Sequence, residues 1–177
     1  MPSHAADQPS SLDDLDPAVA AVVRRATTVL VPVDDGNDPA RERARQVAVS
    51  LAAMAGARLV LLDRSDTTYA DSPREFELDR AEVEAIGRPY LLDQIDAASE
   101  AGVSATAFQH SLPGAEALTD AINATHADLV VVPQNLDKPG LLDRLRGGDV
   151  ADRAQGAAPA GVPVVAVADD GSLALVD

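Results

Sequence analysis

The stretch from Asp128 to Ala151, DLVVVPQNLDKPGLLDRLRGGDVA, decides the fold that we expect. It begins with an acidic residue and a short apolar run, continues without regular hydrophobic spacing, and reaches a Gly-Gly pair followed by an Asp that can begin a helix. A buried strand that leads through a loop into a helix is the unit of α/β proteins, and ligands bind at the carboxyl ends of their parallel strands. We therefore expect this loop to border a binding site.

Four further segments of the chain have the hydrophobic pattern of strands. The segments between the predicted strands have apolar residues at the spacing of a helix. The strands are predicted over 28–33, 58–62, 103–110, 128–132 and 162–168. The helices are predicted over 17–25, 39–55, 89–101, 113–126 and 149–158. This alternation indicates an α/β, Rossmann-like or flavodoxin-like three-layer sandwich around a doubly wound parallel sheet of five strands. Residues 64–88 give no clear pattern.

The predicted third strand, 103–110, alternates apolar and polar residues, as a strand at a sheet edge does. The expected strand order is therefore 3-2-1-4-5, with the switch in winding direction between strands 1 and 4. This order places Asp34 and the loop 133–149 on either side of one crevice. Outside the α/β domain, 28–170, we expect an acidic mobile tail with a short helix over 1–27 and a C-terminal extension over 171–177.

Composition excludes several classes of function. The chain has 177 residues, a net charge of −15 and a pI of about 4.3, so its surface repels nucleic acids and anionic membranes. It has no Cys, and no apolar run reaches the roughly 18 residues of a membrane span. The N-terminus has neither a basic nor an apolar signal region, so we expect a cytoplasmic protein.

Four segments of the chain resemble a universal stress protein domain: VLVPVDD at 29–35, AAMAGARLVLL at 52–62, residues 128–154, and GVPVVAVA at 161–168. The resemblance covers 28–168 and implies a regulatory protein of the stress response that forms homodimers through its last strand, here Val162 to Ala168. In its nucleotide-binding members, ATP or AMP is held by a Gly-x-x-Gly, nine-residue, Gly-Ser or Gly-Thr loop. The residues that the resemblance places at such a site are Pro32, Val33, Asp34, Pro133, Gln134, Leu136, Gly147, Gly148, Asp149 and Val150, with Asp34 beside the adenine.

The loop departs from this family pattern. Pro133 and Leu136 replace the first two glycines, and the spacer to Gly148 has eleven residues. Pro133 has no N–H, Leu136 places a side chain where bare backbone is needed, and Asp149 brings a carboxylate to the expected phosphate position. An Asp at that place is also a favoured N-cap, which satisfies the helix N–H groups itself. We therefore predict that the phosphate loop is degenerate and does not bind ATP.

Two alternatives stay open for this loop. Lys138, Arg144 and Arg146 are candidate anion contacts that could replace the lost backbone contacts and allow an adenine nucleotide to bind. The same three cations could instead form surface ion pairs with the acids of the loop.

A phospho-acceptor receiver site is a further candidate, because Asp34 and Asp35 follow the first strand. Such a site needs an Asp after strand 3 and a Lys after strand 5. Strand 3 ends at His110, and the only lysine, Lys138, lies elsewhere. The histidines have no metal-ligand spacing and no catalytic triad is visible, so we expect neither an enzyme nor a bound cofactor. The remaining hypothesis is an interaction module, whose acidic segment 63–100 could dock a basic protein.

Overall fold

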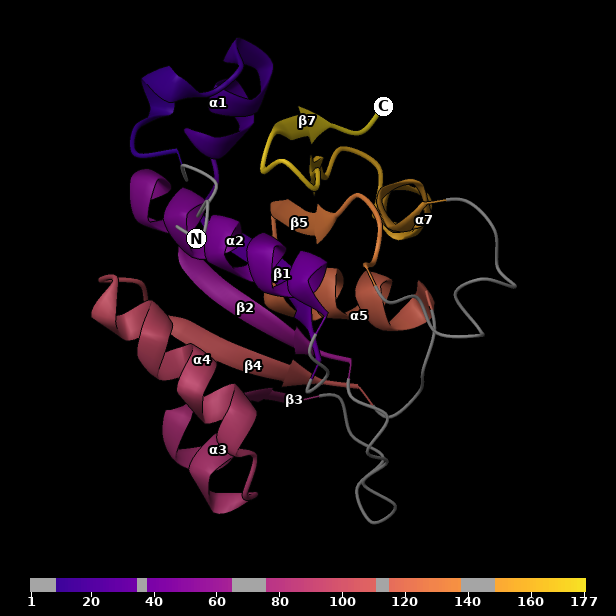
Figure 1. The fold of residues 1–177 in the computed structure, drawn as a ribbon. Coiled ribbons are helices and arrows are strands. Elements are labelled where there is room, and N and C mark those ends of the chain that lie inside the picture. The colour runs from indigo at the N-terminus through magenta and orange to yellow at the C-terminus, as the bar shows by residue number, and fades with distance from the viewer. Residues whose placement is uncertain (1–8, 35–37, 65–75, 111–114, 138–148) are drawn as a thin grey trace.

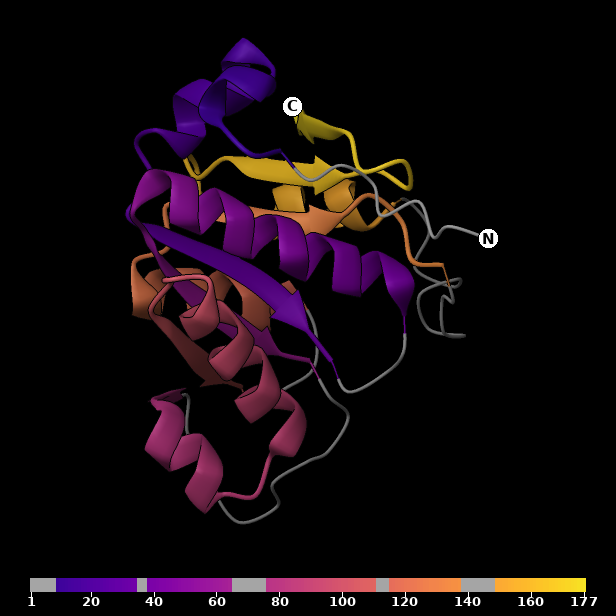
Figure 2. The ribbon, with the colours of Figure 1, turned by 60° about the vertical axis from the view of Figure 1, so that its left-hand side comes forward.

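The computed structural model describes residues 9–34, 38–64, 76–110, 115–137 and 149–177. They form one seven-stranded sheet in the order β3-β4-β2-β1-β5-β6-β7, with helices on both faces (Figures 1 and 2). The strands are β1 (Thr28–Val33), β2 (Arg58–Asp63), β3 (Phe76–Leu78), β4 (Ala105–Gln109), β5 (Leu129–Pro133), β6 (Val164–Val167) and β7 (Leu173–Leu175). The helices are the 3₁₀ helix η1 (Leu12–Asp14) and the α-helices α1 (Pro17–Val23), α2 (Pro39–Ala55), α3 (Arg80–Ala85), α4 (Pro89–Glu100), α5 (Ala115–Thr125) and α7 (Val150–Ala157).

The three-layer α/β fold with a mostly parallel sheet is confirmed, but the prediction of a five-stranded sheet is wrong. β3 pairs antiparallel with β4, and β7 pairs antiparallel with β6. These two strands have three residues each, which is too short for a hydrophobic period to be visible in the sequence. Between them, β4-β2-β1-β5-β6 are parallel and run in the order predicted for the five longer strands.

Neither predicted edge strand lies at an edge. β3 covers β4, although the alternating pattern of β4 suggested an open side. β7, from the predicted C-terminal extension, covers the outer side of β6. The prediction of a homodimer through 162–168 assumed an unpaired edge there, and this premise is wrong because β6 is paired on both sides.

Alternation along the strands divides the core into two layers. Val29, Val31 and Val33 face α1, α2, α3 and α4, whereas Leu30 faces α5 and α7. Asp38 begins α2 as its N-cap, and Gly56 ends it with φ +66°, a left-handed conformation that glycine adopts without a steric penalty. Among the described residues, no helix is long and apolar enough to cross a membrane. Because β1 is parallel to β2 and β5, the carboxyl ends of these three strands lie at one end of this sheet.

Candidate functional site

A pocket of about 480 Å³ opens at the carboxyl ends of β1, β2 and β5, between the sheet, α5 and α7. This volume lies within the roughly 300–1,000 Å³ of small-molecule sites. The floor is apolar, because Pro32, Leu62 and Val132 occupy alternate strand positions that face α5 and α7. Its lining residues are Pro32, Arg41, Leu62, Arg64, Leu118, Val132, Pro133, Leu136, Val150, Arg153, Ala154, Gly156 and Ala157.

Three arginines from three separate elements line this apolar pocket. Arg41 lies in the first turns of α2, Arg64 directly follows β2, and Arg153 lies in α7. Arg41 Nη1 lies 2.9 Å from Asp34 Oδ2, and each side chain is about one fifth exposed (22% and 21%). This pair offsets the charge of Arg41, and the other charged side chains of the lining are those of Arg64 and Arg153, in a chain whose net charge is −15. This concentration of guanidinium groups favours an anionic ligand.

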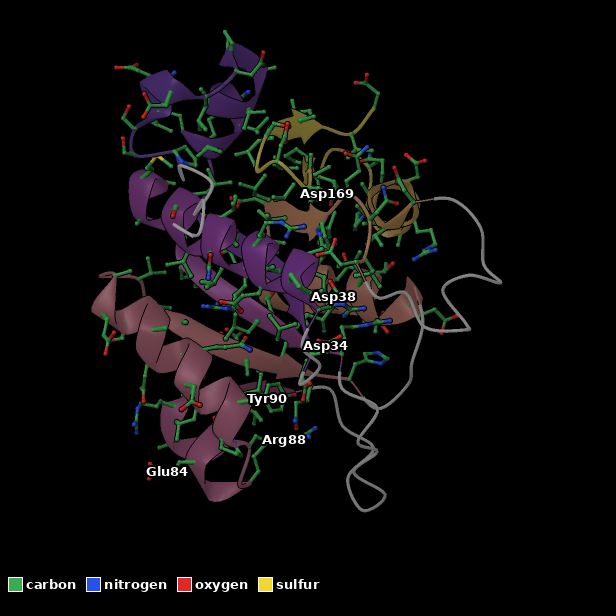
Figure 3. All side chains as sticks on the ribbon, in the orientation of Figure 1. Asp34, Asp38, Glu84, Arg88, Tyr90 and Asp169 are labelled. Atoms are coloured by element: carbon green, nitrogen blue, oxygen red, sulfur yellow. The ribbon has the colours of Figure 1, made fainter. Side chains whose placement is uncertain are left out.

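The chain that follows β5 is fixed beside the pocket by Asp38, which Figure 3 labels. One carboxylate oxygen, Asp38 Oδ1, accepts hydrogen bonds from the backbone N–H of Ala40 at 2.9 Å and of Asp137 at 3.3 Å. Asp38 is 9% exposed, so these bonds are shielded from water. Arg43 lies 3.4 Å from Asp137 and 3.3 Å from Asp169, and so joins the segments after β5 and β6 to α2.

The beginning of α7 is occupied by groups of the protein itself. Asp149 Oδ1 accepts the N–H of Asp152 at 2.7 Å, which confirms Asp149 as the N-cap. The N–H of Val150 donates to the carbonyl of Gln134 at 2.9 Å, and the N–H of Gln134 donates to the carbonyl of Val167 at 2.8 Å. An anion that approached this helix end would therefore meet a carboxylate and two N–H groups that already have acceptors.

The family model of the universal stress protein family matches residues 26–168. This chain belongs to that family. No curated protein sequence matches the chain.

Two solved structures resemble the fold of this family member. A universal stress protein crystallised in complex with cAMP superposes with a TM-score of 0.54 at 22% sequence identity, covering 80% of this chain and 97% of that chain. The hypothetical protein MJ0577 superposes with a TM-score of 0.55 at 11% identity, covering 80% of this chain and 95% of that chain. At these identities the likeness shows the fold alone.

The residues that the family resemblance placed at a nucleotide site are only partly brought together in this universal stress protein. The pocket is lined by four of them, Pro32, Pro133, Leu136 and Val150. Asp34 is not a lining residue, but its carboxylate pairs with Arg41, which is. Val33 does not line the pocket, because its side chain is buried in the opposite core layer. Gln134 contributes its backbone to the start of α7. The other predicted contacts lie outside the described residues: Lys138, Arg144, Arg146, Gly147 and Gly148.

The sequence did not single out the arginines of the pocket. Arg41 belongs to a helix with several charged residues, and Arg153 lies in the helix after the loop. Nothing in their local spacing distinguishes them from surface arginines, and only the fold brings them to one pocket. Among the described residues, no group of three or more His, Asp or Glu side chains could hold a metal ion.

Proposed function

We propose that this universal stress protein is a regulatory domain that binds an adenine nucleotide with a single phosphate, AMP or cAMP, and does not bind ATP tightly. The pocket of about 480 Å³ with three arginines around an apolar floor carries this proposal. A flat base can lie on the apolar floor, and a guanidinium group forms strong, directional hydrogen bonds with a phosphate. The solved relative in complex with cAMP supports a ligand of this class.

The start of α7 is the reason to expect one phosphate instead of three. Further phosphates would extend toward a helix end where Asp149 already caps Asp152, and Pro133 cannot donate a backbone hydrogen bond. Two like charges at ~4 Å repel by on the order of 4 kcal/mol at an effective dielectric of ~20, before water and salt screen them. This repulsion acts against di- and triphosphates more than against AMP.

Calorimetric titration with adenosine, AMP, cAMP and ATP tests the proposal. We expect saturable binding of AMP or cAMP, with ATP and adenosine each at least about tenfold weaker, a difference of about 1.4 kcal/mol. Adenosine is expected to bind weakly because it lacks the anionic group that the arginines would hold. Binding of ATP as tight as that of AMP would show that the α7 end does accept phosphates, and would contradict the proposal.

The acidic face of α3 and α4 supports a second function, the docking of a basic protein. Ile86, the C-cap residue of α3, is 37% exposed and follows Glu82 and Glu84 in the sequence. The exposed acids of this face are Asp79, Glu82, Glu84, Asp93 and Glu100. A basic partner could cover the apolar side chain and pair with the acids around it.

We expect a synthetic lysine-rich peptide to bind this face in a salt-dependent way, and Asp93→Lys with Glu100→Lys to weaken that binding. The control exchanges the same charge elsewhere, with Asp13→Lys and Asp177→Lys, both exposed residues outside α3 and α4. Fluorescence anisotropy measures the binding of the peptide to the wild-type chain and to both double variants. Equal loss in the two double variants would mean that only the net charge matters, and that this face is no docking site.

A further inference from the structure

The outer edge of β6 is a surface on which two copies of this chain could associate. All four residues of β6 are apolar, and none is more than 7% exposed. β5 pairs with one side of the strand, so an uncovered second side would present a row of backbone N–H and C=O groups beside apolar side chains. Open edges of this kind pair with further strands.

β7 covers this edge. Leu175 lies opposite Val165 and Leu173 lies opposite Val167 in an antiparallel register. The N–H of Ala168 donates to the carbonyl of Ser172 at 2.9 Å, next to the pair of Val167 and Leu173. Leu173 and Leu175 pack against the core layer of α1 and α2, and Figure 1 shows β7 beside α1.

A tight turn holds β7 to β6 within one chain. The N–H of Gly171 donates to the carbonyl of Ala168 at 2.9 Å, and Gly171 has φ +83°, which a residue with a side chain rarely adopts. The N–H of Ser172 donates to Asp170 Oδ1 at 2.9 Å. A strand attached through so short a turn competes at high effective concentration with any strand of another molecule.

The outer edge of β7 is a poor site for association. The strand has three residues, and the exposed acids Asp169, Asp170 and Asp177 lie on both sides of it. Hydrogen bonds from the side chain and the backbone N–H of Ser172 hold the pKa of the Asp170 carboxyl below its ordinary value, so it is charged at neutral pH. Short length and like charges are the features by which native sheets prevent pairing at their edges.

We propose that β7 is an intramolecular cover that keeps the edge of β6 from pairing with a second copy of this chain. The intact chain is then a monomer, and detachment of β7 lets the β6 strands of two copies pair antiparallel about a two-fold axis. That pairing is self-complementary, because both strands present only Val and Ala side chains. The inference goes beyond the proposed ligand function and does not depend on it.

Two ways of detaching β7 test the inference by sedimentation velocity at tens of micromolar protein. Leu173→Ser with Leu175→Ser removes the packing of β7 in the full-length chain, and deletion of residues 170–177 removes the strand. We expect dimers from both and a monomer from the unchanged chain. The matched control is Ala174→Ser, because the Ala174 side chain is exposed, and this variant is expected to stay monomeric.

A locked variant gives the reverse test. The chain has no Cys, so Val167→Cys with Leu173→Cys places one disulfide across a facing pair of the hairpin. Its oxidised form is expected to remain monomeric. A detached variant that keeps its far-UV circular dichroism spectrum but stays monomeric would overturn the inference. A dimer of the unchanged chain that persists in the oxidised, locked variant would overturn it as well.

Discussion

Replacement of Asp63 by Ala is expected to lower the free energy of unfolding by about 3–5 kcal/mol, the usual effect of removing one partner of a buried ion pair. Asp63 ends β2, and its Oδ2 accepts hydrogen bonds from Arg88 Nη2 at 3.0 Å and Gln109 Nε2 at 3.1 Å. The hydroxyl of Tyr90 donates to Oδ1 of the same carboxylate. The side chains of Arg88 and Asp63 are 9% and 4% exposed, so the substitution would leave a buried guanidinium without this carboxylate.

Chemical denaturation of the wild-type chain and the variant measures this loss. The control is Asp96→Ala, which removes a carboxylate 2.7 Å from Arg80 on the exposed surface of α4, and a much smaller loss is expected because water screens that pair. The double variant Asp63→Leu with Arg88→Met is expected to recover most of the lost stability, because neither charge then remains buried. Equal losses in Asp63→Ala and Asp96→Ala would contradict a stabilising role of the buried pair.

The cluster around Asp63 explains how β2, β4 and the start of α4 are held together. Arg88 and Tyr90 lie on either side of the first helical residue of α4, Pro89, and the Arg88 guanidinium lies 5.5 Å from the centre of the Tyr90 ring. Figure 3 labels both side chains near the start of α4. One carboxylate at the end of a strand thus fixes the entry of the chain into a helix, on the sheet face opposite the pocket.

The long elements could be predicted from the sequence because each carries its own signal. The β-branched run of β1 and the apolar stripe of α2, ended by Gly56, gave the bounds that the structure shows. β3 and β7 carry no such signal, because a strand of three residues is stable only through the partner strand that covers it. The segment 64–88 was ambiguous for the same reason, since it contains β3 and the short helix α3.

The sequence indicated where a pocket would lie, but not which charged side chains would line it. The strand order predicted a crevice at this end of the sheet, and the pocket there is lined by Pro32 and Pro133, two of the residues that the family resemblance placed at a nucleotide site. The cations were missed, because Arg41, Arg64 and Arg153 are far apart in the sequence and converge only through the fold. Backbone glycines can be recognised from their spacing, whereas side chains that reach a site from different elements cannot.

Replacement of both Arg64 and Arg153 by Gln is expected to weaken the binding of AMP by roughly two orders of magnitude or more. A hydrogen bond to a charged group contributes about 1.5–3 kcal/mol, and about 1.4 kcal/mol corresponds to a tenfold change in affinity. Gln keeps a hydrogen-bonding side chain but removes the charge, so the variant tests electrostatic recognition of the phosphate. Calorimetric titration with AMP and with adenosine measures the effect.

Adenosine distinguishes a phosphate contact from a general disturbance of the pocket. If the two arginines hold the phosphate, the variant loses affinity for AMP and keeps the weak binding of adenosine. Arg45→Gln is the matched control, because Arg45 lies on α2 and pairs with Glu42 instead of lining the pocket, and it is expected to bind AMP as the wild-type chain does. Parallel losses for AMP and adenosine would mean that the arginines shape the pocket without contacting the phosphate, and the anionic ligand class would then be wrong.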